Sequence, residues 1–200
     1  MNTTISTPTP IFTIGYGNRK FDEIIELLKN NKISYLIDIR SSPYSKYNPD
    51  FTRNTLEANL TRYNIRYVYM GDTLGGRPDL PSCYTDGKVD YQKLREKEFY
   101  KQGIQRLQTA WKQNLRVALF CSETKPEECH RSKLVGESLI ENGIDVVHVD
   151  EKGELKTQKM IIEKLTNKLT NGQLSFLGTP PALTKSRKKY RQGEIQNEKT

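Results

Sequence analysis

Short apolar segments alternate with helical segments along most of this chain, and that alternation constrains the fold more than any other feature. Residues 11–14, 34–39 and 116–121 are rich in Ile, Leu, Val and Phe, and their apolar character is nearly continuous. Continuous apolarity is typical of parallel strands that are covered by helices on both faces. Over residues 21–30, apolar side chains recur at helical spacing instead. The pattern predicts an α/β fold, a three-layer Rossmann-like sandwich with a mainly parallel sheet.

The other segments extend the same pattern and set the domain boundaries. We expect strands at residues 67–70 and 145–149, and helices at about 52–63, 91–113, 127–142 and 159–169. Gly143 stands where a left-handed helix cap is expected. Residues 71–90 are broken by glycine and proline, which predicts a long functional loop or lid. The domains expected are a flexible N-terminus at 1–10, a single α/β domain at 11–170 and an extended basic C-terminal tail at 171–200.

Length and charge narrow the class of protein. The 200 residues suit one domain, and no apolar stretch approaches the roughly 20 residues that a membrane span needs. The N-terminus shows no secretory signal, so we expect a cytoplasmic protein with no membrane partner. The formal net charge is +8, and half of it lies in residues 184–200. Such a tail is most often a solvated chain end, and the alternative is contact with a nucleic-acid phosphate backbone.

The cysteine content points to reduced thiols. Cys83, Cys121 and Cys129 are an odd number in a chain without a visible export signal, which argues against a disulfide framework. A functional cysteine in this chain is therefore expected to be either a nucleophile or a metal ligand.

Unusual polar groups follow two predicted strands directly, at the edge where open α/β sheets bind their ligands. Gly15, Tyr16 and Gly17 follow the first strand and could present backbone N–H groups to an anion. A plain strand-to-helix turn is the alternative. Asp38 and Arg40 end the second strand. Arg40 either pairs with Asp38 structurally or points into a pocket as an anion-binding fork.

The loop after the strand that ends at Cys121 holds the densest set of reactive groups. It contains Glu123, Cys129, His130 and Arg131. In one interpretation Cys121 is a thiolate nucleophile, because a helix N-terminus and nearby cations lower a thiol pKa. In a second, the two cysteines, Glu123 and His130 are metal ligands, although adjacent residues normally diverge on a helix and the spacing matches no standard zinc motif. In a third, Cys121 is a small buried residue that ends a strand.

Several motifs in chain order together resemble one protein family. They are Thr13-Ile14-Gly15-Tyr16-Gly17, Ile37-Asp38-Ile39-Arg40-Ser41-Ser42-Pro43, Leu74-Gly75-Gly76, Cys121-Ser122-Glu123 and Cys129-His130-Arg131. With this set, the chain from about residue 11 to residue 149 is similar to the domain-of-unknown-function family 488. Tyr16 and Asn18 depart mildly from the family pattern. The resemblance implies the α/β fold, and the family name carries no established reaction.

A weaker resemblance, at the level of the fold, is to rhodanese-like domains. Their catalytic loop runs from a strand-terminal Cys to an Arg-Ser pair that starts a helix, as Cys121 and Arg131-Ser132 do here. Nine residues separate Cys121 from Arg131, more than in the rhodanese loop, so the same tight amide cradle is not expected. Persulfide transfer is therefore implied only as an analogy of fold.

Together these features favour an enzyme-like pocket for an anionic substrate, phosphate- or nucleotide-like, at the carboxyl edge of the sheet. Arg40 and Arg131 would bind the anion. Cys121 or Glu123 would act as nucleophile or base of a hydrolase or transferase, with His130 setting protonation near neutral pH. No cofactor is expected. The rest of the expected substrate site consists of Gly15, Tyr16, Gly17, Asp38, Ser41, Gly75 and Gly76.

The competing expectation is a non-catalytic nucleic-acid-binding module. The basic tail together with Lys46, Arg53, Arg62 and Arg66 would then follow a phosphate backbone. Removing the chain after Leu183 would weaken nucleic-acid binding strongly, whereas a pocket enzyme would lose little.

Overall fold

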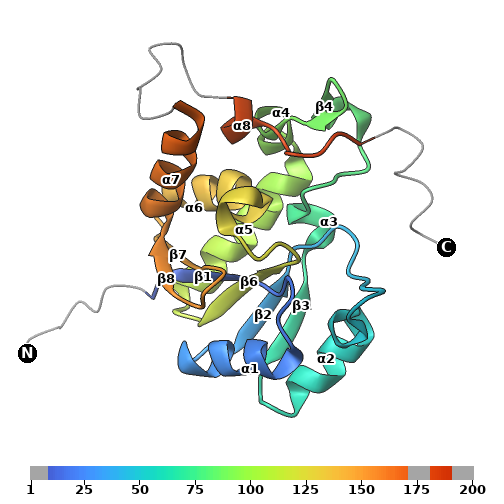
Figure 1. Cartoon of the computed structure of the whole chain (residues 1–200), viewed down its shortest axis with the longest axis vertical. Coiled ribbons are helices and arrows are strands. Elements are labelled where there is room, and N and C mark those ends of the chain that lie inside the picture. The colour runs from blue at the N-terminus through green and yellow to red at the C-terminus, as the bar shows by residue number, and fades with distance from the viewer. Residues whose placement is uncertain (1–8, 171–180, 191–200) are drawn as a thin grey trace, which may run out of the picture.

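A six-stranded sheet forms the middle layer of the protein, in a computed structural model that describes residues 9–170 and 181–190 (Figure 1). The strands lie in the order β3-β2-β6-β1-β7-β8. Their bounds are Ile11–Gly15 for β1, Tyr35–Asp38 for β2, Arg66–Tyr69 for β3, Val117–Cys121 for β6, Val146–Val149 for β7 and Leu155–Thr157 for β8. All neighbours pair in parallel except β8, which pairs antiparallel with β7. The predicted, mainly parallel sheet is confirmed, and the short edge strand β8 is an addition to it.

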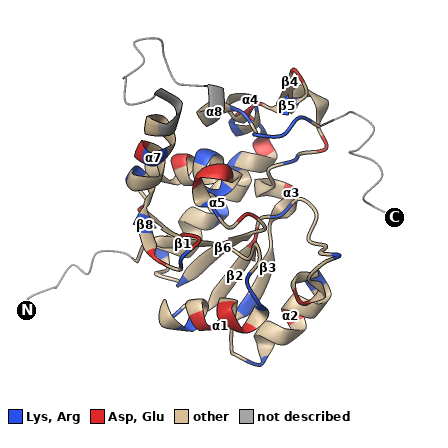
Figure 2. Cartoon of the chain, in the orientation of Figure 1, with Lys and Arg blue, Asp and Glu red and all other residues tan. Residues whose placement is uncertain are grey.

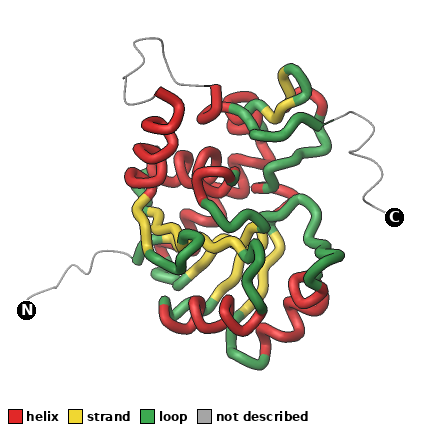
Figure 3. Tube along the Cα trace, in the orientation of Figure 1, coloured by secondary structure: helices red, strands yellow, loops and turns green. Residues whose placement is uncertain are grey.

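Helices cover both faces of this sheet and complete the three-layer sandwich (Figure 3). On one face lie α1 (Phe21–Asn30) and α2 (Arg53–Thr61), and on the other lie α4 (Tyr91–Arg95), α5 (Glu98–Lys112), α6 (Glu137–Glu141) and, beside them, α7 (Gln158–Thr170). Alternate side chains of β6, such as Leu119 and Phe120, enter opposite cores. The predicted fold class is therefore confirmed. Within the described residues, no helix combines the length and the apolar composition needed to cross a membrane.

Residues 71–90 are more ordered than the expected loop or lid. They form the short helix α3 (Gly71–Leu74), a 3-10 turn and the two-stranded hairpin of β4 (Tyr84–Thr85) and β5 (Lys88–Val89). Asp86 and Gly87 both have positive φ, of 54° and 74°. An Asp-Gly pair in this conformation is a favoured two-residue hairpin turn, so the sequence did carry the signal. Because Leu74, Cys83 and Val89 are fully buried, the segment is part of the core rather than a lid.

The segment expected as one helix at 127–142 is broken into three pieces. A 3-10 turn, η3, spans Pro126–Glu128, a π-helical turn, η4, spans Arg131–Gly136, and α6 follows directly. Cys129 interrupts the helical path because its backbone is extended, with φ −109° and ψ 150°. Gly143 has the predicted left-handed conformation, with φ 73°.

Part of the expected C-terminal tail packs on the domain. Pro181–Thr184 forms α8, and the residues after it run along the β4–β5 hairpin. The Ser186 N–H donates to the Val89 carbonyl at 2.9 Å, and the Tyr190 N–H donates to the Gly87 carbonyl at 2.7 Å. Figure 2 shows this stretch as a run of Lys and Arg beside the hairpin. We call residues 184–190 the C-terminal segment. The rest of the tail, 171–180 and 191–200, and residues 1–8 of the expected flexible N-terminus lie outside the described residues.

A buried polar chain ties β1, β7 and α7 together. The ring of His148 is fully buried, with Nδ1 2.7 Å from the Thr13 hydroxyl and Nε2 bonded to Gln158 Oε1. Gln158 donates in turn to the Ser132 carbonyl at 3.0 Å, which orients its amide oxygen toward His148. Burial, together with the charge of Arg131, lowers the pKa of His148 to about 3. His148 is therefore neutral in the folded protein at pH values where an unfolded chain would protonate it.

This shift predicts a specific loss of stability in mild acid. A histidine whose folded pKa is depressed stabilises fully above pH ~6.5, and the stabilisation is lost as pH falls from there toward 3. Between pH 7 and pH 5, the free energy of unfolding of the wild type should fall by about 2 kcal/mol more than that of His148→Gln. Urea unfolding at the two pH values measures this. His130 is common to both proteins and cancels, and equal losses would contradict the buried, neutral state of His148.

Candidate functional site

Four reactive side chains meet at the carboxyl edge of the sheet. Cys121 ends β6, and Glu123, Cys129 and His130 lie on the loop that follows it. One sulfur, oxygen or nitrogen atom from each residue lies within 4.8 Å of those of the other three. We call these four residues the reactive cluster. The structure brings together Cys121, Glu123 and His130, the three residues expected to be catalytic, and also Cys129, which the metal-ligand interpretation grouped with them.

The distances inside the reactive cluster are short. The two sulfur atoms are 2.8 Å apart, and both cysteines are free thiols. The Cys121 thiol donates to Glu123 Oε2 at 2.7 Å, and the Cys129 thiol lies 3.3 Å from the same oxygen. His130 Nδ1 lies 3.8 Å from the Cys121 sulfur and 3.6 Å from the Cys129 sulfur. Both sulfur atoms therefore contact the same carboxylate and the same ring nitrogen.

The break in the helix at Cys129 makes this convergence possible. Neighbouring residues on a helix point about 100° apart, which is the basis of the expectation that Cys129 and His130 diverge. The backbone of Cys129 is extended, and His130 is the residue that precedes η4, with φ −63° and ψ −20°. The two side chains can therefore face the same point. The expectation fails because it placed both residues inside one continuous helix.

Two glycines that follow α3 pack closely at this edge, and one of them, Gly76, lies directly against the His130 ring. A Cβ on Gly76 would lie 2.7 Å from Cγ of His130, and a Cβ on Gly75 would lie 2.4 Å from the Ser41 hydroxyl. Only a residue without a side chain permits these approaches. On its other side, His130 Nε2 is 3.1 Å from the Ile39 carbonyl, which can only accept, so Nε2 carries the hydrogen. Nδ1 is thereby directed at the sulfur atoms.

The protonation of the reactive cluster is uneven. Burial favours the neutral thiol of Cys121, but the hydrogen bond from Cys129 and the charge of His130 outweigh it and lower its pKa to about 6. Burial and the neighbouring Cys121 raise the pKa of Cys129 well above its usual value. Burial acts to lower the pKa of His130, yet the charges of Cys121 and Glu123 raise it. The pKa of Glu123 is lowered, since His130 and the two thiols overcome its burial.

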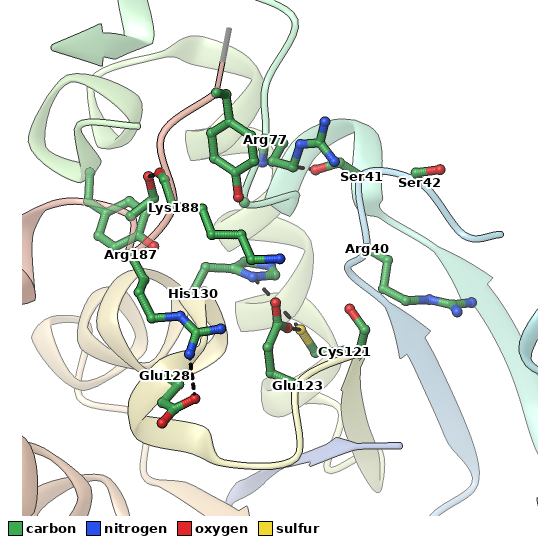
Figure 4. Close-up of a pocket in the computed structure, with 15 residues that line it drawn as sticks. Arg40, Ser41, Ser42, Arg77, Cys121, Glu123, Glu128, His130, Arg187 and Lys188 are labelled. Atoms are coloured by element: carbon green, nitrogen blue, oxygen red, sulfur yellow. Dashed lines mark hydrogen bonds and ion pairs between the residues drawn. The ribbon is translucent and has the colours of Figure 1, made fainter. Parts of the chain in front are cut away.

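A cavity of about 220 Å³ lies directly over the reactive cluster (Figure 4). Cys121, Glu123 and His130 line its floor, and Ser41, Gly76 and Tyr91 are among the residues of its walls. The lining also includes the basic residues Arg77, Arg187 and Lys188, which we call the basic rim. Arg187 and Lys188 extend from the C-terminal segment toward the reactive cluster. The C-terminal segment is therefore one wall of the cavity, whereas an extended, solvated tail was expected.

Contacts at both ends hold that wall in position. Arg187 pairs with Glu128 on η3, with Nη1 2.8 Å from the carboxylate. The Arg77 guanidinium lies over the Tyr190 ring, 4.6 Å from the centroid of that ring. These contacts join segments that are far apart in the sequence, which is why periodicity and local motifs did not reveal the basic rim.

Arg40 borders the cavity, but its guanidinium lies on the other face of the sheet. Nε and Nη2 of Arg40 bind the Asp38 carboxylate at 2.9 Å and 2.6 Å, and the Tyr67 hydroxyl donates to Asp38 at 2.8 Å. Because Asp38 pairs in register with Phe120, the side chains of Asp38 and Arg40 share a face opposite to that of Cys121. Figure 4 shows Arg40 pointing away from the cluster. Arg40 therefore forms a structural ion pair with Asp38, and its guanidinium does not point into the cavity as an anion-binding fork would.

Arg131 supports the loop from beneath and does not line the cavity. It is fully buried, and it donates to the carbonyls of Glu123 at 2.7 Å, Thr124 at 2.9 Å and Val149 at 3.3 Å. Its guanidinium is thus engaged by backbone oxygen atoms, which differs from the expected direct contact with a substrate anion. The side chain fixes the position of the loop that carries Glu123.

The glycines after β1 pack against that same loop and present no anion cradle. The N–H groups of Tyr16 and Gly17 donate to the carbonyls of Cys121 and Ser122 at 3.1 Å and 2.9 Å. A Cβ on Gly15 would lie 1.7 Å from the Glu123 carbonyl oxygen. The Tyr16 ring stacks on Phe51 with centroids 4.4 Å apart, on the face of Arg40. The alternative of a plain strand-to-helix turn describes this segment.

Of the residues expected to bind nucleic acid, Arg187 and Lys188 of the basic tail line the cavity, whereas Lys46, Arg53, Arg62 and Arg66 do not. Arg66 begins β3, while Arg53 packs over Tyr69 at the other end of that strand, 4.5 Å from the ring centroid. Nucleic-acid binding stays a prediction.

The buried position of Arg131 predicts that even a lysine cannot replace it. Lysine keeps the charge but cannot reach three carbonyls from a planar fork, so Arg131→Lys should lower the free energy of unfolding by about 2–4 kcal/mol. Arg106→Lys, on the exposed face of α5, is the matched control and should change it by less than about 0.5 kcal/mol. Urea unfolding measures both. Wild-type stability of Arg131→Lys would contradict the supporting role.

Comparison with known proteins places the chain in a family. A family model described as a domain of unknown function, DUF488, matches residues 20–137. This range contains β2, β6 and the whole reactive cluster. No curated protein and no solved structure matches the chain. Since the matched range is more than half of the sequence and agrees with the motifs above, the chain belongs to the DUF488 family.

Proposed function

We propose that the protein is an enzyme of the hydrolase or transferase class that acts on a small anionic substrate. The proposal rests on the fact that residues of the reactive cluster and the basic rim line the same cavity. The reactive cluster supplies nucleophilic and proton-transferring groups at the floor, and the basic rim supplies positive charge above it. A substrate held by the rim would place its reacting group over the cluster.

The charges of the basic rim favour an anionic ligand. Arg77, Arg187 and Lys188 come from two segments and line one cavity, whose acidic residues are Glu123 on the floor and Glu128 beside Arg187. Arginine and lysine in such an arrangement recognise phosphate and carboxylate groups. This assigns anion binding to the rim, in place of Arg40 and Arg131.

The size of the cavity favours a small anionic group with its remainder extending outward. A second cavity of about 280 Å³ adjoins the first, and Ser41, Ser42 and Arg77 line both. The two volumes together reach the range of typical small-molecule sites. We infer that the reacting group occupies the cavity over Cys121 and that the rest of the substrate, nucleotide-like or otherwise, occupies the second.

The reactive groups at the floor suit proton transfer. The Cys121 thiol lies 2.7 Å from Glu123 Oε2, a distance that allows direct proton transfer, and His130 Nδ1 lies 3.8 Å from the same sulfur, so His130 would act on a substrate group placed above them. In this proposal Cys121, Glu123 and His130 are the residues that act on the substrate, while Ser41 and Gly76 shape the wall.

Two adjacent positions in the C-terminal segment provide a matched test. Inorganic phosphate and adenosine monophosphate should bind to the wild type, measured by isothermal titration calorimetry. Arg187→Gln combined with Lys188→Gln should weaken that binding about tenfold or more, because charge-assisted hydrogen bonds are lost. Lys189→Gln removes the same charge one residue further on, outside the cavity lining, and should change affinity less than about twofold.

Two outcomes would contradict the proposal. If Lys189→Gln weakens binding as much as the double variant does, the affinity depends on the overall positive charge of the segment and not on contact with the basic rim. If neither probe binds to the wild type at about 10 mM, the cavity is not a site for phosphate-bearing substrates.

A further inference from the structure

We propose that the reactive cluster binds one divalent metal ion of the zinc type, held by Cys121, Cys129 and His130, with Glu123 as an exchangeable ligand on the cavity side. This inference deepens the proposed function, and it rests on that function for the anionic ligand that would reach the ion. The evidence is the spacing of the donor atoms, the fixed direction of the His130 ring and the burial of both cysteines.

The donor atoms already have nearly the spacing of a tetrahedral shell. With metal–sulfur bonds of about 2.3 Å and metal–nitrogen bonds of about 2.0 Å, sulfur and nitrogen ligands lie about 3.5 Å apart and two sulfurs about 3.8 Å apart. His130 Nδ1 lies 3.8 Å and 3.6 Å from the two sulfurs, and Glu123 Oε2 lies 3.3 Å from the Cys129 sulfur. The sulfur atoms, at 2.8 Å, would separate by about 1 Å around an ion.

The surroundings of His130 are those of a metal-binding histidine. Such a residue commonly donates its second ring N–H to a carbonyl or carboxylate, which fixes the tautomer and aims the free nitrogen at the ion. Here Nε2 lies 3.1 Å from the Ile39 carbonyl, and Gly76 packs directly against the ring. The Cys129 sulfur accepts a hydrogen bond from the Arg131 N–H at 3.4 Å, a contact that also suits a bound thiolate.

The donor atoms of the cluster are buried together. Cys121 and Cys129 are each 1% exposed, and Glu123 contacts both sulfur atoms. A metal ion of the zinc type binds cysteine as the thiolate, so its binding would release the thiol protons and its positive charge would compensate the buried sulfur and carboxylate ligands. The guanidinium nearest in sequence, that of Arg131, is engaged by backbone carbonyls.

Thiolate and imidazole ligands select the class of metal. Two sulfurs with one ring nitrogen and one carboxylate suit zinc or iron(II), while magnesium and calcium prefer oxygen ligands throughout. Among the donors, Glu123 also lines the cavity beneath the basic rim. An anionic oxygen of the substrate could replace its carboxylate at the ion by simple ligand exchange, and the ion would then polarise that substrate group.

Elemental analysis of the full-length protein, prepared without a polyhistidine tag and dialysed against zinc, tests the inference. The wild type should hold about one equivalent of zinc, and Cys129→Ala and His130→Ala should each hold less than about a tenth of it. Cys83→Ala is the matched control, because Cys83 is an equally buried free thiol outside the cluster, and it should retain the wild-type content. Glu123→Gln should keep the ion with weaker affinity, as expected for an exchangeable ligand.

Cobalt(II) provides a second readout that does not depend on whether a variant folds. Wild-type protein loaded with cobalt should show a thiolate-to-metal absorption band in the near ultraviolet, and prior alkylation of its thiols should abolish it. A wild type that takes up less than about a tenth of an equivalent of zinc and shows no such band would overturn the inference. Equal zinc contents in the wild type and a folded Cys129→Ala would overturn it as well.

The metal inference and the proposed function fail separately. If the protein takes up no zinc but its phosphate binding still depends on Arg187 and Lys188, the metal inference is wrong and the anion-binding site stands. If the protein binds one equivalent of zinc but its affinity for phosphate is unchanged by both substitutions, the proposed anion-binding site is wrong and the metal inference stands.

Discussion

The buried guanidinium of Arg131 is the contact on which the geometry of the site depends. It joins the carbonyls of Glu123 and Thr124, on the loop after β6, to the carbonyl of Val149 at the end of β7. A charge that is fully buried must keep these partners, because losing them would leave it unsolvated. The loop therefore has one position, and Glu123 is presented to the two thiols without rearrangement.

The same constraint explains the glycine at the end of β1. A Cβ on Gly15 would lie 2.2 Å from Nη1 of Arg131, so only glycine leaves space for the guanidinium beside the strand. The charge of Arg131 also reaches the buried His148 and contributes to its lowered pKa. Gly15 and His148, which lie far apart in the sequence, are therefore both linked to Arg131: one leaves space for its guanidinium, and the other has its pKa lowered by the charge.

Much of the fold and part of the site could be predicted from the sequence. Continuous apolar segments gave β1, β2 and β6, and helical spacing gave α1 with its observed bounds, Phe21–Asn30. The cluster members Cys121, Glu123 and His130 could be found because they follow a buried strand. The predictions that were wrong concern residues whose positions depend on local backbone geometry or on contacts between distant segments. Arg40 was placed on the wrong face of the sheet edge, since strand alternation sends its side chain away from Cys121.

Two of the three basic-rim residues lie in the C-terminal segment, a different part of the chain from the reactive cluster. The family match ends at residue 137 and includes the reactive cluster, whereas Arg187 and Lys188 lie well beyond it. Substitutions in that segment can reshape the wall of the cavity while the floor, held by Arg131 and Gly76, stays as it is. Under the proposed function, substitutions at residues 187 and 188 would therefore change which anion is bound, while the reactive groups keep their positions.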